Sequence, residues 1–101
     1  MSAPFVYRFA WDPAKATANR RKHGVSFEQA AAVFRDPLAL SRYDDEHSEG
    51  EERWLTLGLG ENGVLLVVSH TFEELSEQEA RVRLISAREA TAPERRQYEG
   101  G

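Results

Sequence analysis

Two apolar segments joined by a short turn sequence constrain the fold more than any other feature of the chain. Residues 53–59 (Arg-Trp-Leu-Thr-Leu-Gly-Leu) alternate as a strand does, which places the three leucines on one face. Residues 60–63 (Gly-Glu-Asn-Gly) suit a turn, because Asn and Gly tolerate a positive φ. Residues 64–68 are apolar throughout, which is typical of a central strand. The pair therefore predicts a hairpin inside a sheet.

Asp12 and Pro13 mark the start of a first helix. The Asp carboxylate can accept hydrogen bonds from the free amides of the first turn, and proline fits the first helical position. The last turn is rich in cations and Gly24 follows it, as expected at a helix C-terminus. This pattern predicts a helix over residues 14–22.

A second helix begins directly afterwards. Ser26 and Gln29 have the spacing of a capping box, in which each side chain bonds the other's backbone amide. Apolar residues then recur at helical spacing: Phe27, Ala30, Ala31 and Phe34. The sequence Asp36-Pro37 predicts the end of this helix.

The remaining elements complete one architecture. Residues 5–9, 38–43 and 81–86 are predicted strands, the acidic residues 72–79 lack a period and are a predicted loop, and Thr91-Ala92-Pro93-Glu94 predicts a third helix start. Hairpin-joined strands with flanking helices indicate an α+β fold. We expect a single domain over residues 1–101, with an antiparallel sheet, two N-terminal helices and one C-terminal helix.

Length and composition exclude several classes of protein. A chain of 101 residues with 41% hydrophobic and 30% charged residues can form one folded domain and argues against disorder. There is no cysteine, so disulfide scaffolds and thiol chemistry are excluded. The longest apolar run, residues 64–68, is too short for a membrane span, and the first residues do not resemble a signal peptide. We therefore expect a cytoplasmic protein with no membrane partner.

Charge is segregated along the chain, although its net value is only −4. Cations gather in residues 15–22 and again at Arg81, Arg83 and Arg88, whereas residues 44–52 and 73–79 are acidic. Such blocks can give a cationic face and an anionic loop, or they are plain solvated surface. Composition alone favours the solvated surface.

No pattern indicates a metal or a cofactor. His23, His47 and His70 are far apart and have no recognised ligand spacing. The chain also lacks a glycine-rich phosphate loop and a Gly-x-Ser-x-Gly motif. We expect neither metal nor cofactor, and a small-molecule enzyme that uses the histidines is the weakest of the hypotheses considered.

Several remaining residues suit the chemistry of RNA phosphates. They are Lys22 and His23 at a helix end, Glu52 and Arg53 at a strand start, Arg81 and Arg83 on one strand face, and Arg88 just after that strand. RNA is cleaved without metal when a base takes the 2′-OH proton, a cation stabilises the phosphorane and an acid protonates the leaving oxygen. Each residue also has a purely structural interpretation, as a helix-end cation or an exposed pair.

Taken together, the motifs resemble the BrnT family of bacterial toxins. The matching segments of the first half are Phe9-x-Trp11-Asp12-Pro13-x-Lys15-Ala16, Asn19-x-x-Lys22-His23-Gly24-Val25-x-Phe27-x-x-Ala30 and Val33-Phe34-x-Asp36-Pro37. Those of the second half are Glu52-Arg53, Gly58 and Arg83-Leu84-Ile85-Ser86-Ala87-Arg88-x-Ala90-x-x-x-Glu94-Arg95-x-x-Tyr98. The resemblance covers nearly the whole chain in order.

The resemblance implies a toxin of a type II toxin–antitoxin system with a RelE-like fold, which cleaves RNA and arrests translation. Its partner would be a BrnA-type antitoxin that binds DNA. The toxin would contact operator DNA only indirectly, through this antitoxin. Carried over by position, it implies catalytic roles for Lys22, His23, Glu52, Arg83 and Arg88, and RNA contacts by Arg20, Arg21, Arg53 and Arg81. His23 or Glu52 would be the base, Arg83 and Arg88 would hold the scissile phosphate, and Lys22 would stabilise charge or donate a proton.

A second hypothesis belongs to a different class. The chain would be a non-catalytic module that clamps a basic antitoxin segment and acts as co-repressor of its own operon. The acidic residues 44–52 and 73–79 and the negative net charge motivate it.

Overall fold

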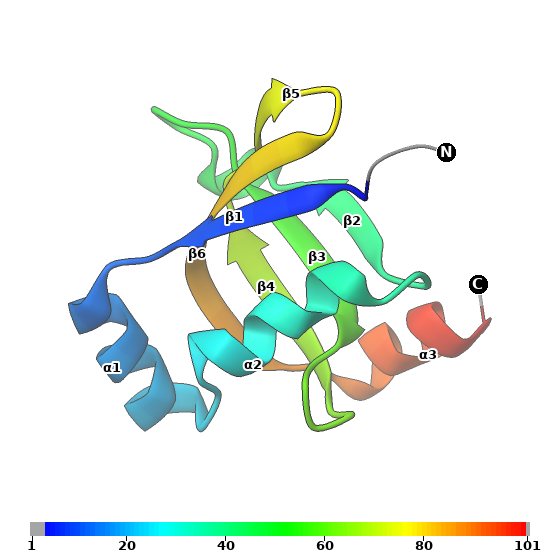
Figure 1. Cartoon of the computed structure of the whole chain (residues 1–101). Helices are drawn as coiled ribbons and strands as arrows, with labels where there is room; N and C mark the ends of the chain where they lie inside the picture. The colour runs from blue at the N-terminus through cyan, green and yellow to red at the C-terminus, as the bar shows by residue number, and fades with distance from the viewer. Residues whose placement is uncertain (1–3, 101) are drawn as a thin grey trace.

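The structure is a computed structural model that describes residues 4–100. Its elements, in chain order, are β1 (Val6–Ala10), α1 (Pro13–His23), α2 (Phe27–Ala31), the 3₁₀ helix η1 (Ala32–Arg35), β2 (Leu40–Tyr43), the 3₁₀ helix η2 (Asp45–His47), β3 (Trp54–Leu59), β4 (Leu65–His70), β5 (Glu73–Ser76), β6 (Glu79–Glu89) and α3 (Ala92–Gly100). These elements form an α+β fold with three α-helices and a six-stranded sheet (Figure 1).

The sheet is mixed, with the strand order β1-β6-β4-β3-β2, and β5 pairs with β6. The predicted hairpin is present, because β3 and β4 pair in antiparallel register from Trp54↔His70 to Leu59↔Leu65. The expectation of an antiparallel sheet is wrong for β1, which runs parallel to β6 from Val6↔Glu79 to Ala10↔Arg83. Two α-helices and four strands separate these partners along the chain, and a parallel pair needs such a long connection.

The predicted loop over residues 72–79 is also wrong, because it contains β5 and the turn into β6. All four residues of β5 are exposed, so no burial pattern marks the strand in the sequence. Glu73 and Arg81 are directly opposite each other in the ladder and form an ion pair of 2.5 Å. The acidic side chains of this segment therefore belong to an exposed hairpin.

Both N-terminal helices begin at their predicted caps. The Asp12 carboxylate accepts the Ala14 N–H at 2.9 Å, and α1 ends at Gly24, whose φ is 71°. Ser26 and Gln29 form the reciprocal capping box of α2. The predicted second helix is α-helical only to residue 31, after which η1 continues it to residue 35.

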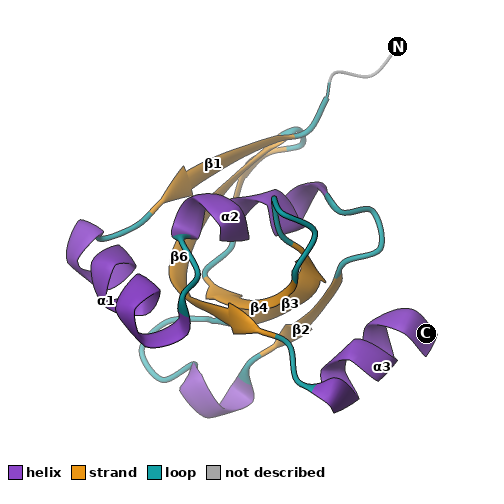
Figure 2. Cartoon of the chain, turned by 90° about the horizontal axis from the view of Figure 1, so that it is seen from below, coloured by secondary structure: helices purple, strands orange, loops and turns teal. Residues whose placement is uncertain are grey.

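The strands curve around α2, and the larger part of the core lies on this concave side (Figure 2). Its buried residues are Val25, Phe27, Ala30, Val33, Leu66, Val68, Val82, Leu84 and Ala87. A smaller cluster lies on the opposite face of the sheet, where Leu57, Leu65 and Val67 pack with the α3 residue Tyr98. Because both faces of β4 are covered, its sequence is apolar on both sides.

Asn19 on α1 is buried and bonds the open edge of β6 beyond the end of β1. Its amide accepts the Ala87 N–H at 3.0 Å and donates to the Ala87 carbonyl at 2.9 Å, as a neighbouring strand would. It also donates to the Val25 carbonyl at 3.0 Å. This side chain therefore fixes α1 along the edge of β6.

Candidate active site

An irregularity in β6 brings two of its predicted site arginines to one face. Arg83 and Arg88 are five residues apart, so strict alternation would place them on opposite faces. The ladder with β4 shifts between the pairs Ser69↔Ser86 and His70↔Leu84, so that Ile85 is the extra residue of a β-bulge. Because Leu84 and Ala87 both point into the concave core, Arg83 and Arg88 both lie on the other face.

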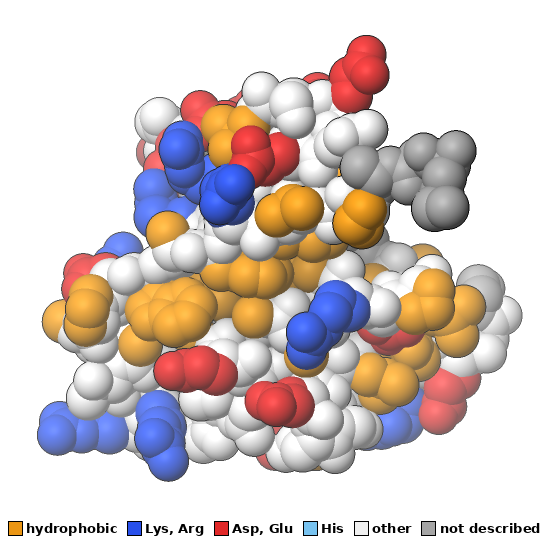
Figure 3. All heavy atoms as spheres, viewed as in Figure 1, with side chains coloured by type: hydrophobic (Ala, Val, Ile, Leu, Met, Phe, Trp, Pro, Cys, Tyr) orange, Lys and Arg blue, Asp and Glu red, His pale blue; other side chains and the backbone are white. Residues whose placement is uncertain are grey.

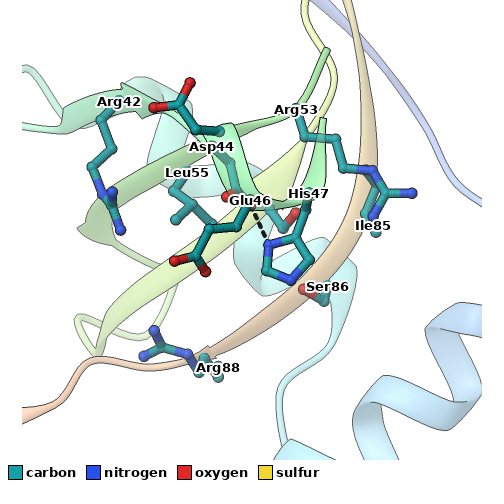
Figure 4. Close-up of a pocket in the computed structure, with 11 residues that line it drawn as sticks. Arg42, Asp44, Glu46, His47, Arg53, Leu55, Ile85, Ser86 and Arg88 are labelled. Atoms are coloured by element: carbon teal, nitrogen blue, oxygen red, sulfur yellow. Dashed lines mark hydrogen bonds and ion pairs between the residues drawn. The ribbon is translucent and has the colours of Figure 1, made fainter. Parts of the chain in front are cut away.

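A polar cleft of about 440 Å³ lies on this second face, between the η2 segment and strands β2, β3 and β6. It is lined by Arg42, Asp44, Asp45, Glu46, His47, Arg53, Leu55, Ser69, Ile85, Ser86 and Arg88 (Figure 4). Leu55 also packs against the small core cluster of this face, so one rigid sheet supports the cleft floor. The lining combines an imidazole, carboxylates and three guanidinium groups.

Asp44 and His47 form a hydrogen-bonded pair in the cleft. The His47 Nδ1 lies 2.9 Å from Asp44 Oδ2, and since a carboxylate only accepts, Nδ1 carries the hydrogen (Figure 4). Among the described residues, Nε2 has no hydrogen-bond partner. Asp44 is only 7% exposed. Its backbone N–H donates to the Arg53 carbonyl at 2.9 Å, and its carbonyl accepts from the Ser48 hydroxyl at 2.5 Å. The carboxylate is therefore held in place, whereas the imidazole remains accessible.

Arg88 is oriented by the first turn of α3. Its guanidinium donates two hydrogen bonds to the Glu94 carboxylate, at 2.8 and 2.9 Å. Glu94 in turn accepts the Thr91 N–H at 2.8 Å, in a capping arrangement at the start of α3. The Arg88 hydrogen bonds hold the pKa of Glu94 at about 2, against an ordinary value of 4.5. Arg88 is thus a fixed cation at the cleft.

The other predicted arginines of β6 are paired with carboxylates. Arg83 donates to Glu51 Oε1 at 2.6 Å, and Arg53 approaches the same oxygen at 3.4 Å. The hydrogen bond from Arg83 lowers the pKa of Glu51. Arg81 is bound to Glu73 in the exposed hairpin.

The cleft therefore gathers only part of the residues that the resemblance implies. Arg53 and Arg88 line it, and Arg83 is joined to Arg53 through Glu51. Glu52 is exposed in the loop before β3 and does not line it.

The four α1 residues, Arg20, Arg21, Lys22 and His23, do not line the cleft. Their helix is bound along the edge of β6 through Asn19. Figure 3 shows Lys and Arg side chains gathered over α1 at the lower left of the molecule. The cations of α1 thus form a group of their own.

Sequence reasoning missed three cleft residues, Arg42, Asp44 and His47. The three-residue spacing of Asp44 and His47 was a usable signal for a bonded pair, but the acidic surroundings obscured it. His70, in contrast, is buried, and burial lowers its pKa. Its Nδ1 donates to the Thr71 carbonyl at 2.8 Å and its Nε2 accepts from Thr56 at 2.7 Å, so both nitrogens are used inside the fold.

Neither a metal-binding cluster nor a membrane-spanning helix is found among residues 4–100. Within this range, no group of three or more His, Asp or Glu side chains is arranged to hold a metal ion. None of the helices in the same range has the length and apolarity needed to cross a membrane.

Comparison with known proteins gives a consistent result. The family model described as the ribonuclease toxin BrnT of type II toxin–antitoxin systems matches residues 11–94. The crystal structure of the Brucella abortus ribonuclease toxin BrnT is similar in fold, with a TM-score of 0.57 and 22% sequence identity, over 85% of this chain and 99% of that one. The search of the curated proteins found no match. Because the family model covers most of the chain, the protein belongs to the BrnT family of ribonuclease toxins of type II toxin–antitoxin systems.

Proposed function

We propose that the chain is a metal-independent endoribonuclease whose active site is the cleft between η2 and β6. The observation that carries this proposal is the Asp44–His47 pair in one cleft with Arg42 and Arg88. The imidazole can serve as the base and the guanidinium groups can stabilise the phosphorane, which are two of the three functions that metal-free RNA cleavage requires.

His47 acts as the general base. With Nδ1 bonded to Asp44, its free Nε2 takes the proton of a ribose 2′-OH, which then attacks the adjacent phosphorus. The buried Asp44 carboxylate keeps the imidazole in this tautomer and stabilises the imidazolium that forms. A positioned base of this kind contributes about 10²–10⁴-fold to the rate.

Arg88 and Arg42 hold the phosphate. Arginine remains charged at every relevant pH and presents parallel N–H donors to two phosphate oxygens. Arg88 is preorganised by Glu94, so little rearrangement is needed as charge builds on the phosphorane. We assign the proton on the leaving 5′-oxygen to water, because the cleft is open to solvent and its carboxylates are acceptors. The products are a 2′,3′-cyclic phosphate and a 5′-hydroxyl.

The residues implied by the family resemblance give a competing assignment. In that version the base is His23 or Glu52, Lys22 stabilises charge or donates a proton, and Arg20 and Arg21 contact the RNA backbone. None of these five residues lines the cleft. The assignment would require RNA to reach from the cleft to α1, and single-residue variants distinguish the two versions.

The toxin context is also part of the proposal. A BrnA-type antitoxin would neutralise the protein, and operator DNA would be reached only through that antitoxin. RNA cleavage would inhibit translation in the cytoplasm, as for mRNA interferases, and the fold relationship would extend to RelE-like toxins.

A non-catalytic antitoxin-binding module and co-repressor remains the alternative. Its main support was the acidic segments, but several of their carboxylates are used within the chain. Asp44 bonds His47, Glu51 bonds Arg83, and Glu73 and Glu79 pair with Arg81 and Arg8. Fewer acids are therefore free to clamp a basic segment than the sequence suggests.

The test is incubation of the purified protein with RNA in EDTA, followed by analysis of the RNA ends. We expect cleavage to persist, to yield cyclic phosphate ends, and to disappear in Arg88→Ala while the variant remains folded by circular dichroism. Intact RNA together with tight antitoxin binding would support the non-catalytic module instead. Cleavage that requires added metal would refute metal independence.

A further inference from the structure

A further cationic group connects the start of β3 with β6 beside the cleft. It consists of Arg53 and Arg83, which share the Glu51 carboxylate at 3.4 and 2.6 Å. Arg53 also lines the cleft, so the group begins where the cleft ends. Both arginines and Glu51 are partly exposed, with 30%, 43% and 36% of their side-chain surfaces accessible.

Arg83 and Arg88 are held by different carboxylates, Glu51 and Glu94, so their guanidinium groups are oriented separately. Five residues of strand extend about 15 Å, and the bulge shortens this only slightly. A bidentate guanidinium–phosphate contact needs N···O distances of about 2.8 Å. Arg88 lines the cleft and Arg83 does not, so if Arg88 holds the scissile phosphate, Arg83 is placed for a different phosphate of the same RNA strand.

Glu51 contributes little to the fold in this position. A partly exposed ion pair stabilises a protein only weakly, because water screens the charges and ordering two long side chains costs entropy. Its clear effect is to neutralise two guanidinium groups that would otherwise face solvent as free cations. The Arg53 Nε is moreover buried without a hydrogen-bond partner among the described residues. The carboxylate that Arg53 shares therefore leaves one of its N–H donors without an acceptor.

We propose that Arg53 and Arg83 form a second phosphate subsite for single-stranded RNA, and that the Glu51 carboxylate occupies it in the free protein. RNA binding displaces Glu51 into solvent, and a backbone phosphate takes over its hydrogen bonds. The subsite rests on the proposed function for its ligand class. Glu51 and RNA therefore compete for the two arginines, because the carboxylate carries the same sign of charge as a phosphate.

The experiment measures equilibrium binding of a fluorescent single-stranded RNA with 2′-O-methyl riboses, which cannot be cleaved because its nucleophile is blocked. Glu51→Gln is compared with Glu49→Gln, since Glu49 is an exposed acid of the same loop with no ion pair among the described contacts. We expect Glu51→Gln to bind about two- to fivefold tighter than Glu49→Gln at low salt, the size of one surface pair.

Salt dependence supplies the second readout. Freeing one phosphate-binding cation should steepen the plot of log affinity against log salt by about 0.7 in Glu51→Gln. Arg83→Gln should weaken binding and flatten the plot by about the same amount. Glu51→Gln should increase affinity less in the Arg83→Gln background than in the wild type, because Glu51 acts mainly through Arg83, its closer partner. Arg83→Gln also tests the subsite if Glu51→Gln does not fold.

The outcomes separate the subsite from the proposed function. Equal affinities of Glu51→Gln and Glu49→Gln, or an unchanged slope in Arg83→Gln, would overturn the subsite, and so would a lack of RNA binding by every variant. Cleavage of unmodified RNA is measured separately. If cleavage is absent but Glu51→Gln still binds more tightly, the subsite stands and the proposed function fails.

Discussion

At the scale of single residues, the cleft depends on one carboxylate that is buried and one imidazole that is not. Asp44 has lost most of its solvent contact, so its role is to hold His47 rather than to meet RNA. The backbone of Asp44 is fixed by two residues that follow η2, the Arg53 carbonyl and the Ser48 hydroxyl. Geometry around His47 is therefore set before substrate binds.

Replacing Asp44 by Asn tests this role. The amide has nearly the same shape, but it cannot stabilise an imidazolium and can favour the other tautomer. We expect kcat for RNA cleavage to fall at least about tenfold, with KM little changed, because a base contributes about 10²–10⁴-fold in total. Steady-state kinetics on a single-site RNA measure this. An increase in KM alone would assign Asp44 to binding instead.

At the scale of elements, α1 and α3 are attached to β6 by polar contacts of different kinds. Asn19 binds the edge of the strand from inside the core, whereas Glu94 binds Arg88 near the surface. The first contact positions a helix and the second positions a side chain of the site. Removing each contact therefore has a separate expected effect on stability.

Asn19→Ala should destabilise the protein by at least about 2 kcal/mol, since it leaves the Ala87 N–H and two carbonyls without partners in a buried place. The unfolding free energy from denaturant titration measures this. Asn19→Asp should also destabilise, because its second oxygen would face the Val25 and Ala87 carbonyls. A loss below about 0.5 kcal/mol in both variants, as at an ordinary surface site, would show that water replaces the amide.

Glu94 gives the protein a dependence of stability on pH. Its folded pKa of about 2 lies below its ordinary value of 4.5, so the unfolded chain binds more protons between these values. The stabilisation is present above about pH 4.5 and is lost as the pH falls toward 2. With allowance for solvent screening, it amounts to about 1–2 kcal/mol.

Glu94→Gln should remove that part of the pH dependence. Measured unfolding free energies of the wild type and the variant should converge as the pH falls from 4.5 to 2 and differ most above it. A difference that stays constant across this range would mean that the Arg88–Glu94 pair contributes nothing through its charge.

The sequence predicted those elements that depend on neighbouring residues. The caps at Asp12 and Ser26 and the β3–β4 hairpin are local, and all three are present. The parallel pairing of β1 with β6 is a contact between distant segments, and no local pattern encodes it. β5 was missed because a strand exposed on both faces has no alternation.

At the scale of the whole molecule, the site was harder to predict than the fold. The sequence identified Arg53, Arg83 and Arg88 as phosphate-binding candidates, and the fold connects all three to one face of the sheet. It could not indicate that a bulge at Ile85 permits this arrangement. It also could not identify His47, whose function depends on a cleft completed by residues about 40 positions later.

The position of α1 is the other feature that only the whole fold reveals. Lys22 and His23 are prominent in the family resemblance, yet the helix that carries them is bound along the strand edge, away from the cleft lining. Two assignments of the base therefore compete, one based on geometry and one on likeness. They differ in which histidine variant loses the ability to cleave RNA.

The most direct test is the rate of RNA cleavage in EDTA by His47→Gln and by His23→Gln, each at a matched concentration of folded protein. We predict that His47→Gln loses at least about 100-fold in rate, as expected when a general base is removed, while His23→Gln cleaves near the wild-type rate. If His47→Gln cleaves RNA at the wild-type rate and His23→Gln loses activity, the account is contradicted and the active site lies at the end of α1.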